Sequence, residues 1–163
     1  MHKVLQVFFD NPTPQGGYYL RELSRKASLA PTSVKNHLQT LINQGLVVAK
    51  QHRVHDYDTY YASENQAFRF HKSQYTLYQL QEAVNYIQES TLADCIILFG
   101  SASRGEDTPQ SDIDLYVQAP QTDLQLTTYE NVLNRKINVL FQESFENFSR
   151  ELKNNLVNGI LVR

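Results

Sequence analysis

The residues of this chain that could do chemistry lie between Leu98 and Val117, in the segment LFGSASRGEDTPQSDIDLYV. The apolar runs CIILF and IDLYV indicate two buried strands, and the polar stretch between them indicates a small-residue loop or a short helix. Side chains at positions i and i+2 of a strand project to the same face, so Asp112 and Asp114 are expected to point together. Two adjacent carboxylates repel each other unless a divalent cation lies between them, as in metal-dependent phosphoryl-transfer sites.

The turn before this pair offers groups that suit phosphates. Gly100 lets the backbone approach a ligand closely, while Ser101, Ser103 and Arg104 carry hydrogen-bond donors. The plain alternative is a strand-loop-strand unit with a surface pair of aspartates. The glycine-serine turn and the strand-like flanks on both sides favour the ligand-binding interpretation.

The combination GS-x10-DxD resembles the nucleotidyltransferase superfamily that includes DNA polymerase β, and within it the minimal nucleotidyltransferase (MNT) domains. The resemblance implies a small mixed sheet with helices on one side, catalysis and Mg²⁺ binding by Asp112 and Asp114, and an NTP substrate, with ATP expected. It also implies that the nucleotide is bound by Gly100, Ser101, Ser103, Arg104 and Ser111.

Larger members of that superfamily place a third carboxylate on the strand that corresponds to residues 136–141, KINVLF. The matching position here holds Asn138, which we therefore consider a possible third metal-binding position. Its carbonyl oxygen can coordinate a metal, but the amide brings no charge and cannot act as a base. Glu143 would substitute only if the register of the strand were shifted. The aspartate pair alone could hold one Mg²⁺ together with nucleotide phosphates.

The elements around the aspartate pair are predicted from their patterns. The apolar stripe Leu77, Leu80, Val84 and Ile87 predicts a connecting helix, which covers either its own domain or the same helix of a second subunit in a homodimer. Beyond the pair we expect a helix at 122–134, a strand at 136–141, one final helix at 143–155 with Phe145, Phe148 and Leu152 on one side, and a short last strand within 159–163.

The first sixty residues predict three helices followed by a β-hairpin. The helices are expected at residues 4–11, 18–27 and 28–45, and the strands at 46–53 and 59–63. This order resembles a winged helix-turn-helix, and the segment from Arg21 to Val47 resembles ArsR-like transcription regulators. The resemblance implies that the third helix enters the major groove of DNA. The DNA-binding residues expected on that helix and on the wing are Ser33, Lys35, Asn36, Gln39, Thr40 and Arg53.

The charge distribution agrees with two different tasks. The whole chain has a net charge of −2, but residues 1–63 hold seven Lys or Arg against four Asp or Glu. We expect an α+β protein with a winged helix-turn-helix domain at 1–63, a connecting helix at 64–91 and a minimal nucleotidyltransferase domain at 92–163. A winged helix used only for protein interaction is the alternative for the first domain, because its positive charge is modest.

No membrane partner is expected, because no apolar run is long enough to span a bilayer and no signal peptide begins the chain. The single cysteine, Cys95, lies in an apolar run and agrees with a cytoplasmic location.

The leading functional hypothesis is a Mg²⁺-dependent nucleotidyltransferase with a DNA-binding, autoregulatory domain. Many MNT domains act as antitoxins that transfer AMP from ATP to a tyrosine or another hydroxyl of a HEPN-type toxin, so a HEPN-type partner and operator DNA are expected. One alternative is a non-catalytic transcriptional regulator with a degenerate or nucleotide-sensing pocket, which Asn138 favours. A second alternative is a nucleotidyltransferase of the antibiotic-modifying kind that acts on small molecules.

Overall fold

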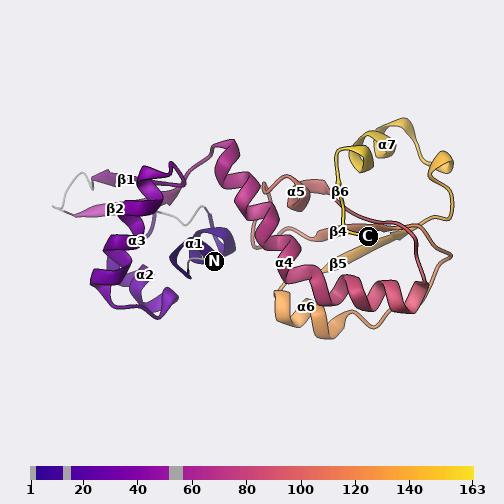
Figure 1. Ribbon diagram of the computed structural model, residues 1–163, viewed down its shortest axis with the longest axis horizontal. Coiled ribbons are helices and arrows are strands. Elements are labelled where there is room, and N and C mark those ends of the chain that lie inside the picture. The colour runs from indigo at the N-terminus through magenta and orange to yellow at the C-terminus, as the bar shows by residue number, and fades with distance from the viewer. Residues whose placement is uncertain (1–2, 13–15, 52–56) are drawn as a thin grey trace. The chain divides into compact units, whose positions relative to one another are not determined.

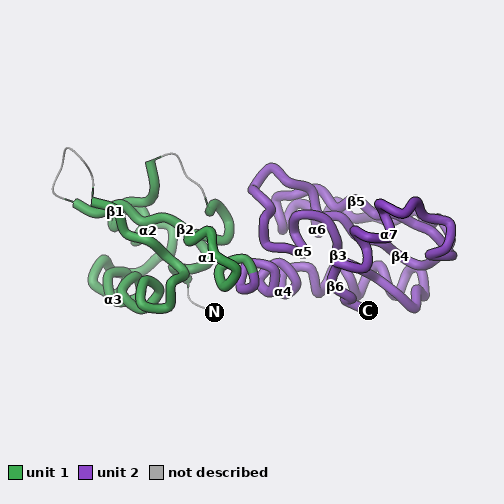
Figure 2. The backbone as a smooth tube through the Cα atoms, turned by 90° about the horizontal axis from the view of Figure 1, so that it is seen from above, with its two compact units in different colours: residues 1–69 green, residues 70–163 purple. Residues whose placement is uncertain are grey.

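The computed structural model describes residues 3–12, 16–51 and 57–163, and the chain forms two compact units. Residues 1–69 make the first unit and residues 70–163 the second (Figure 2). The division falls within the long helix α4 (Gln66–Thr91), so this helix contributes residues to both units. The sequence had indicated a connecting helix over the same stretch.

The N-terminal unit contains three helices and a two-stranded antiparallel sheet (Figure 1). These elements are α1 (Lys3–Asp10), α2 (Leu20–Ala27), α3 (Pro31–Asn43), β1 (Val47–Gln51) and β2 (Asp58–Ala62). Their order is the predicted one, whereas the assignment as a winged helix-turn-helix stays a prediction.

The three helices pack because each presents an apolar stripe to the others. Val34, Leu38 and Leu41 recur on one side of α3 and are buried, as is Leu23 of α2. Tyr18 is also buried, at 1% exposure, and its one hydroxyl proton is shared between the carbonyl oxygens of Asn11 at 2.9 Å and Val7 at 3.3 Å. These contacts leave the polar side of α3 exposed to solvent.

The second unit is built on a four-stranded mixed sheet in the order β5-β4-β3-β6. Strand β4 pairs antiparallel with β3 and parallel with β5, while β6 pairs antiparallel with β3. Its elements after α4 are β3 (Ile96–Phe99), α5 (Gly100–Ser103), β4 (Ile113–Val117), α6 (Thr127–Leu133), β5 (Ile137–Phe141), the 3₁₀ turn η1 (Phe145–Asn147), α7 (Arg150–Val157) and β6 (Ile160–Leu161).

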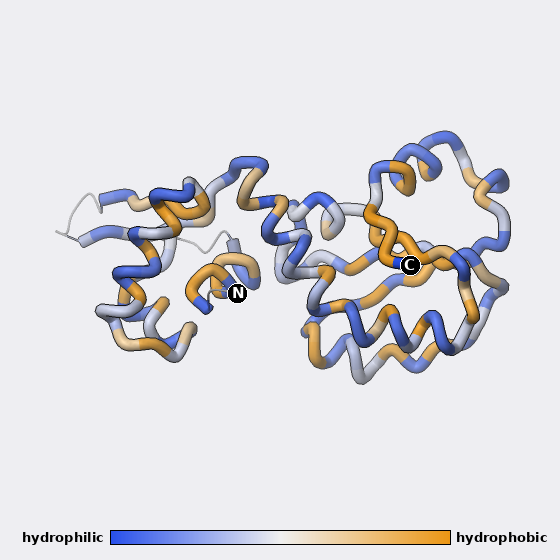
Figure 3. The backbone as a smooth tube through the Cα atoms, viewed as in Figure 1, coloured by the Kyte–Doolittle hydropathy of each residue, from blue (hydrophilic) through white to orange (hydrophobic). Residues whose placement is uncertain are grey.

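Alternation along β4 separates the hydrophobic core from the polar face of the sheet. Ile113, Leu115 and Val117 are buried in one cluster with Leu80 and Ile87 of α4, and residues of α6 pack against this cluster. Figure 3 shows the apolar stretches along the central strands. Because side chains alternate along a strand, the aspartate within β4 is turned to the opposite face of the sheet.

The end of the chain differs from the expected single helix at 143–155. The structure has the turn η1, then Phe148 in an extended conformation, and then α7, whose N-cap Ser149 accepts a hydrogen bond from the Leu152 amide. The Phe148 ring packs edge-on against Tyr116, with ring centroids 5.2 Å apart. This packing lies on the polar face of the sheet, so the expectation of elements on one side holds for α4 and α6 but not for this segment. The helix predicted at 122–134 is also shorter and begins at Thr127.

Candidate active site

Asp112, Asp114 and Asn138 meet on the polar face of the sheet. Asp114 lies in β4 directly across from Asn138 of β5, as the parallel register places them. The Asn138 side-chain nitrogen is 3.2 Å from Asp112 Oδ2 and 3.2 Å from Asp114 Oδ1, so one amide group donates to both carboxylates. Asp112 and Asn138 are exposed and Asp114 is partly exposed, so solvent and ligands reach the group.

Gly100 lies close to this group because it has no side chain. Its φ is +73°, which residues with a Cβ rarely adopt, and a Cβ added here would lie 2.6 Å from Asp114 Oδ2. Phe99, the residue before it, pairs with Asp114 across the β3–β4 ladder. The glycine-serine turn and the second aspartate are therefore in direct contact, as the spacing of the motif suggested.

The remaining residues of the predicted phosphate-binding turn have internal partners. The Ser103 hydroxyl donates to the Gly100 carbonyl at 2.9 Å, and the half-exposed Arg104 forms an ion pair with Glu106 at 2.8 Å. Ser101 is partly exposed, and its carbonyl accepts from the amides of Arg104 and Glu106. The ion pair uses only the Nε of Arg104, so its two terminal nitrogens could still donate to a phosphate.

Ser111 holds the loop before the first aspartate. Its hydroxyl accepts from the Thr108 amide at 2.9 Å and lies 3.1 Å from the Thr108 hydroxyl. Its carbonyl accepts from Arg135 Nε at 2.8 Å. In this structure Ser111 shapes the loop that leads into Asp112.

A buried ionic group supports this loop, and the sequence analysis missed it. Asp107 is 3% exposed and lies between two cations: Arg135 Nη1 is 2.7 Å from its Oδ2, and Lys72 Nζ is 3.2 Å from its Oδ1. The Lys72 ammonium also donates to the backbone carbonyl of Asp107. The sequence holds no pattern that links these three residues, because Arg135 and Lys72 lie 28 and 35 positions from Asp107.

Glu143 does not take the third position. It follows β5 by two residues, and β5 runs parallel to β4 with Phe141 opposite Val117, so Glu143 lies at the far end of the strand from Asp114. Five residues of extended chain separate it from Asn138, which corresponds to about 16 Å. In this register Asn138, and not Glu143, lies beside the two aspartates.

A polar hollow of about 370 Å³ adjoins Asp112. Glu130 of α6 closes one side, where its carboxylate accepts from the Ile137 amide at 3.1 Å and from Lys136 at 3.0 Å. The hydrogen bond from Ile137, together with that from Lys136, lowers the pKa of Glu130. The hollow is lined by Pro109, Gln110, Ser111, Asp112, Thr127, Glu130, Asn131, Asn134, Arg135 and Lys136.

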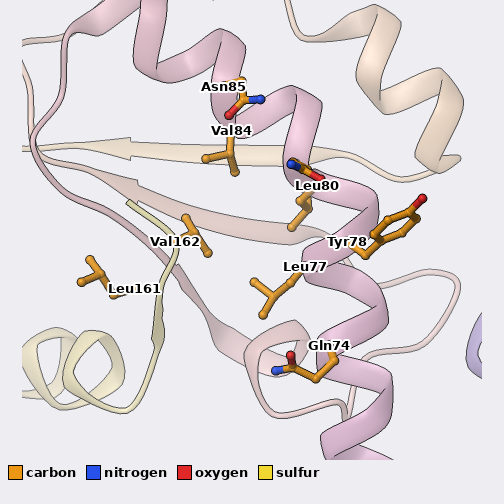
Figure 4. Close-up of a pocket in the computed structure, with 9 residues that line it drawn as sticks. Gln74, Leu77, Tyr78, Leu80, Val84, Asn85, Leu161 and Val162 are labelled. Atoms are coloured by element: carbon orange, nitrogen blue, oxygen red, sulfur yellow. The ribbon is translucent and has the colours of Figure 1, made fainter. Parts of the chain in front are cut away.

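A second hollow, of about 480 Å³, has a different character. It lies between α4 and β6, where Leu77 and Val84 point from the helix toward Val162 (Figure 4). Its lining includes Leu, Val, Gln, Asn and Tyr but no Asp, Glu, Lys or Arg. Since β6 and β5 are at opposite edges of the sheet, this hollow is distant from Asn138.

The predicted DNA-binding residues of α3 are all exposed, and the structure describes Ser33, Lys35, Asn36, Gln39 and Thr40. The Gln39 side-chain nitrogen donates to Asn43 at 3.1 Å, and the Thr40 hydroxyl donates to the Asn36 carbonyl at 3.2 Å. Arg53 lies outside the described residues. DNA binding by this unit stays a prediction.

The aspartates and asparagine together offer oxygen ligands of the kind that Mg²⁺ prefers. Within residues 3–12, 16–51 and 57–163, no group of three or more His, Cys, Asp or Glu could hold a metal ion. A metal bound by Asp112 and Asp114 would therefore need further oxygen ligands, from an amide carbonyl, water or the phosphates of a substrate.

A sequence model of the family described as polymerase beta, nucleotidyltransferase matches residues 81–162, which is half of the chain. The chain belongs to this family. The matched range includes the glycine-serine turn, both aspartates and Asn138. A search of curated proteins found no significant match. Among the helices of the described part of this nucleotidyltransferase-family chain, none is long and apolar enough to cross a membrane.

Proposed function

We propose that the C-terminal unit binds Mg²⁺ and a nucleoside triphosphate, ATP foremost, and transfers a nucleoside monophosphate to a hydroxyl of a partner protein. The observation that carries the proposal is the convergence of Asp112, Asp114 and Gly100 in a family whose members are nucleotidyltransferases. The catalytic and metal-binding residues would be Asp112 and Asp114, with the phosphates over the Gly100-Ser101 turn.

The side chains fit a divalent cation. The two carboxylates both accept hydrogens from one amide group, so the place between them already suits positive charge. Rotation of the Asn138 amide by half a turn would direct its carbonyl oxygen to the same place. Bound there, Mg²⁺ would neutralise phosphate charge and orient the phosphate groups.

The proposed reaction is a substitution at phosphorus, in which no atom changes its oxidation state. The acceptor hydroxyl oxygen forms a bond to the α-phosphorus, the bond from that phosphorus to the bridging oxygen breaks, and pyrophosphate leaves. The hydroxyl proton passes to water, because Asn138 cannot accept it. Rate enhancement would then come from positioning and charge neutralisation.

Thermal unfolding with and without Mg·ATP tests the binding step. A ligand at a hundred times its Kd stabilises the folded protein by about 2.7 kcal/mol. We expect Mg·ATP to raise the Tm of the wild type, and we expect no rise in the double variant Asp112→Asn/Asp114→Asn. Asp94→Asn/Asp123→Asn removes two exposed carboxylates elsewhere in the same unit and should keep the rise. A full rise in the site variant would refute the assignment.

We also propose that the N-terminal unit binds operator DNA through α3 and represses the operon of this chain, as an antitoxin paired with a HEPN-type toxin would. The exposed polar face of α3 supports this role, since Asn and Gln side chains can bind adenine edges. Asn36→Ala should weaken binding to the upstream DNA, while Asn155→Ala, the same change at an exposed position of α7 in the other unit, serves as a control. Binding that does not depend on salt, or that is unchanged in Asn36→Ala, would contradict the proposal.

Asn138 supports a second candidate, a non-catalytic regulator whose site only senses nucleotide. The two candidates differ in one measurement. Incubation with α-labelled ATP and the product of a neighbouring HEPN-like gene labels the partner if the chain is an enzyme. Binding of Mg·ATP without labelling of the partner favours the regulator.

A further inference from the structure

Arg135 fastens the loop that precedes β4 at two places. Its Nε donates to the Ser111 carbonyl at 2.8 Å, and its Nη2 donates to the Asp112 carbonyl at 3.2 Å. Its Nη1 contacts Asp107 Oδ2 at 2.7 Å, at the other end of the same loop. One planar guanidinium therefore joins both ends of the segment 107–112, a geometry that a lysine ammonium cannot reproduce.

The Arg135 guanidinium is itself held in place by Asp107. Asp107 is buried, and its second cation, Lys72, comes from α4 and is 2% exposed. A buried carboxylate that loses its cationic partners is strongly destabilised, and this keeps Asp107 beside both cations. Through these two ion pairs, Asp107 links Arg135 to Lys72 of α4, the helix that covers the sheet.

The loop needs such support because Asp112 lies outside the strand. Strand β4 begins at Ile113, whose amide donates to the Lys136 carbonyl at 2.9 Å. The ladder therefore pairs Asp114 directly, while Asp112 is the first residue outside it and is joined to it through the planar peptide bond to Ile113. The Asp112 carbonyl accepts from Arg135 Nη2 at 3.2 Å, while the Asp112 carboxylate accepts from the Asn138 amide at 3.2 Å.

We propose that Arg135 is a positioning residue, which holds the Ser111–Asp112 backbone so that the Asp112 carboxylate joins Asp114 in binding a divalent cation. The inference rests on the proposed metal and nucleotide site and adds to it the residue that sets its spacing. Partners that orient metal ligands typically contribute about 10-fold to 100-fold to metal affinity. Arg135 contacts no carboxylate of the site, so it acts through the backbone of the loop.

Two substitutions separate positioning from simple charge compensation. Arg135→Lys keeps a cation beside Asp107 but loses the fork to the two carbonyls, whereas Arg135→Gln also loses the charge. We expect Arg135→Lys to keep a Tm close to that of the wild type and to bind Mn²⁺ at least about tenfold more weakly in an EPR titration. Arg150→Lys, the same change at an exposed position of α7, should leave Mn²⁺ affinity unchanged.

The outcomes distinguish this inference from the function on which it rests. A wild type that binds no Mn²⁺ overturns the metal site and the positioning role together. A wild type that binds Mn²⁺ as tightly as Arg135→Lys overturns the positioning role alone. If Arg135→Lys does not fold, the wild-type NMR resonance of Arg135 Nε–H decides the matter: it should shift on Mg²⁺ addition, and an unmoved signal refutes the proposal.

Discussion

Asn138 lies directly across from Asp114 in the parallel pair β4–β5, and the Asn138 amide nitrogen is 3.2 Å from Asp114 Oδ1. The same nitrogen bonds to Asp112 at the same distance. In the absence of a cation, the amide hydrogens separate two carboxylates that would otherwise repel each other. Without a metal, the amide of Asn138 therefore offsets part of the repulsion between the two aspartates that a bound cation would otherwise neutralise.

Replacing the Asn138 amide with a carboxylate should increase the affinity of the site for a cation. We expect Asn138→Asp to lower the Tm of the metal-free protein, because three carboxylates would then face each other, and to bind Mg²⁺ more tightly than the wild type. Isothermal titration with Mg²⁺ and thermal unfolding in EDTA measure the two effects. Asn155→Asp, which adds the same charge on an exposed part of α7, is the control. Equal Mg²⁺ affinity in Asn138→Asp and wild type would contradict the assignment of the third position.

Gly100 should tolerate no side chain. Gly100→Ala places a methyl group against Asp114 Oδ2 in a left-handed conformation, so we expect a loss of about 1–3 kcal/mol and no Mg·ATP-dependent rise in Tm. Gly16 has a similar φ of +80° but open space around it, and Gly16→Ala isolates the backbone strain from the clash. Urea unfolding and the Mg·ATP assay compare the two variants. Mg·ATP binding that survives in Gly100→Ala would argue against contact between the turn and the site.

The buried Tyr18 should make the N-terminal unit sensitive to alkali. Burial, with Glu22 and Asp10 nearby, raises the pKa of the Tyr18 hydroxyl to about 12. Because the folded state binds this proton more tightly than the unfolded state, the contribution of Tyr18 is full below about pH 10 and is lost as the pH rises toward 12.

Tyr18→Phe measures that contribution. The substitution removes one donor proton that two carbonyl oxygens share, which typically costs about 1 kcal/mol, so the variant should be less stable than the wild type at pH 8. The difference in unfolding free energy should shrink between pH 10 and pH 12, when both proteins are followed by circular dichroism. A difference that stays constant over this range would show that Tyr18 does not titrate with folding.

The N-cap Ser149 should contribute to the stability of α7. Its hydroxyl accepts from the Leu152 amide at 3.3 Å, and loss of an N-cap typically costs about 1 kcal/mol. We therefore expect Ser149→Ala to lower the Tm by several degrees, while Ser90→Ala, at an exposed position of α4, should have little effect. Equal Tm values for the two variants would show that the cap contributes nothing.

The sequence predicted the parts of the fold that depend on local pattern. Alternation along IDLYV predicts Asp114 on the polar face, and the strand predicted at KINVLF places Asn138 directly across from Asp114. Helical periodicity at 143–155 was misleading, because the contact between Phe148 and Tyr116 favours extended backbone at that point. Periodicity describes neighbours along the chain, and this contact joins residues from different elements.

The ionic support of the loop could not be predicted for the same reason. Lys72 comes from a helix, Asp107 from a loop and Arg135 from the second position before a strand, and no spacing in the sequence links them. The hydroxyl of Ser103 and the guanidinium of Arg104 were expected to face phosphates, but both have partners within the turn. Residue types and spacing predicted which side chains lie together on this face of the sheet, while their contacts required the three-dimensional arrangement.

The place of Asn138 also has an evolutionary consequence. Each asparagine codon differs from an aspartate codon by a single base, and the strand register already aims this side chain between the two carboxylates. A three-carboxylate site is thus one point mutation away and needs no change of backbone. Selection could therefore adjust the strength of this site in either direction without rebuilding the fold.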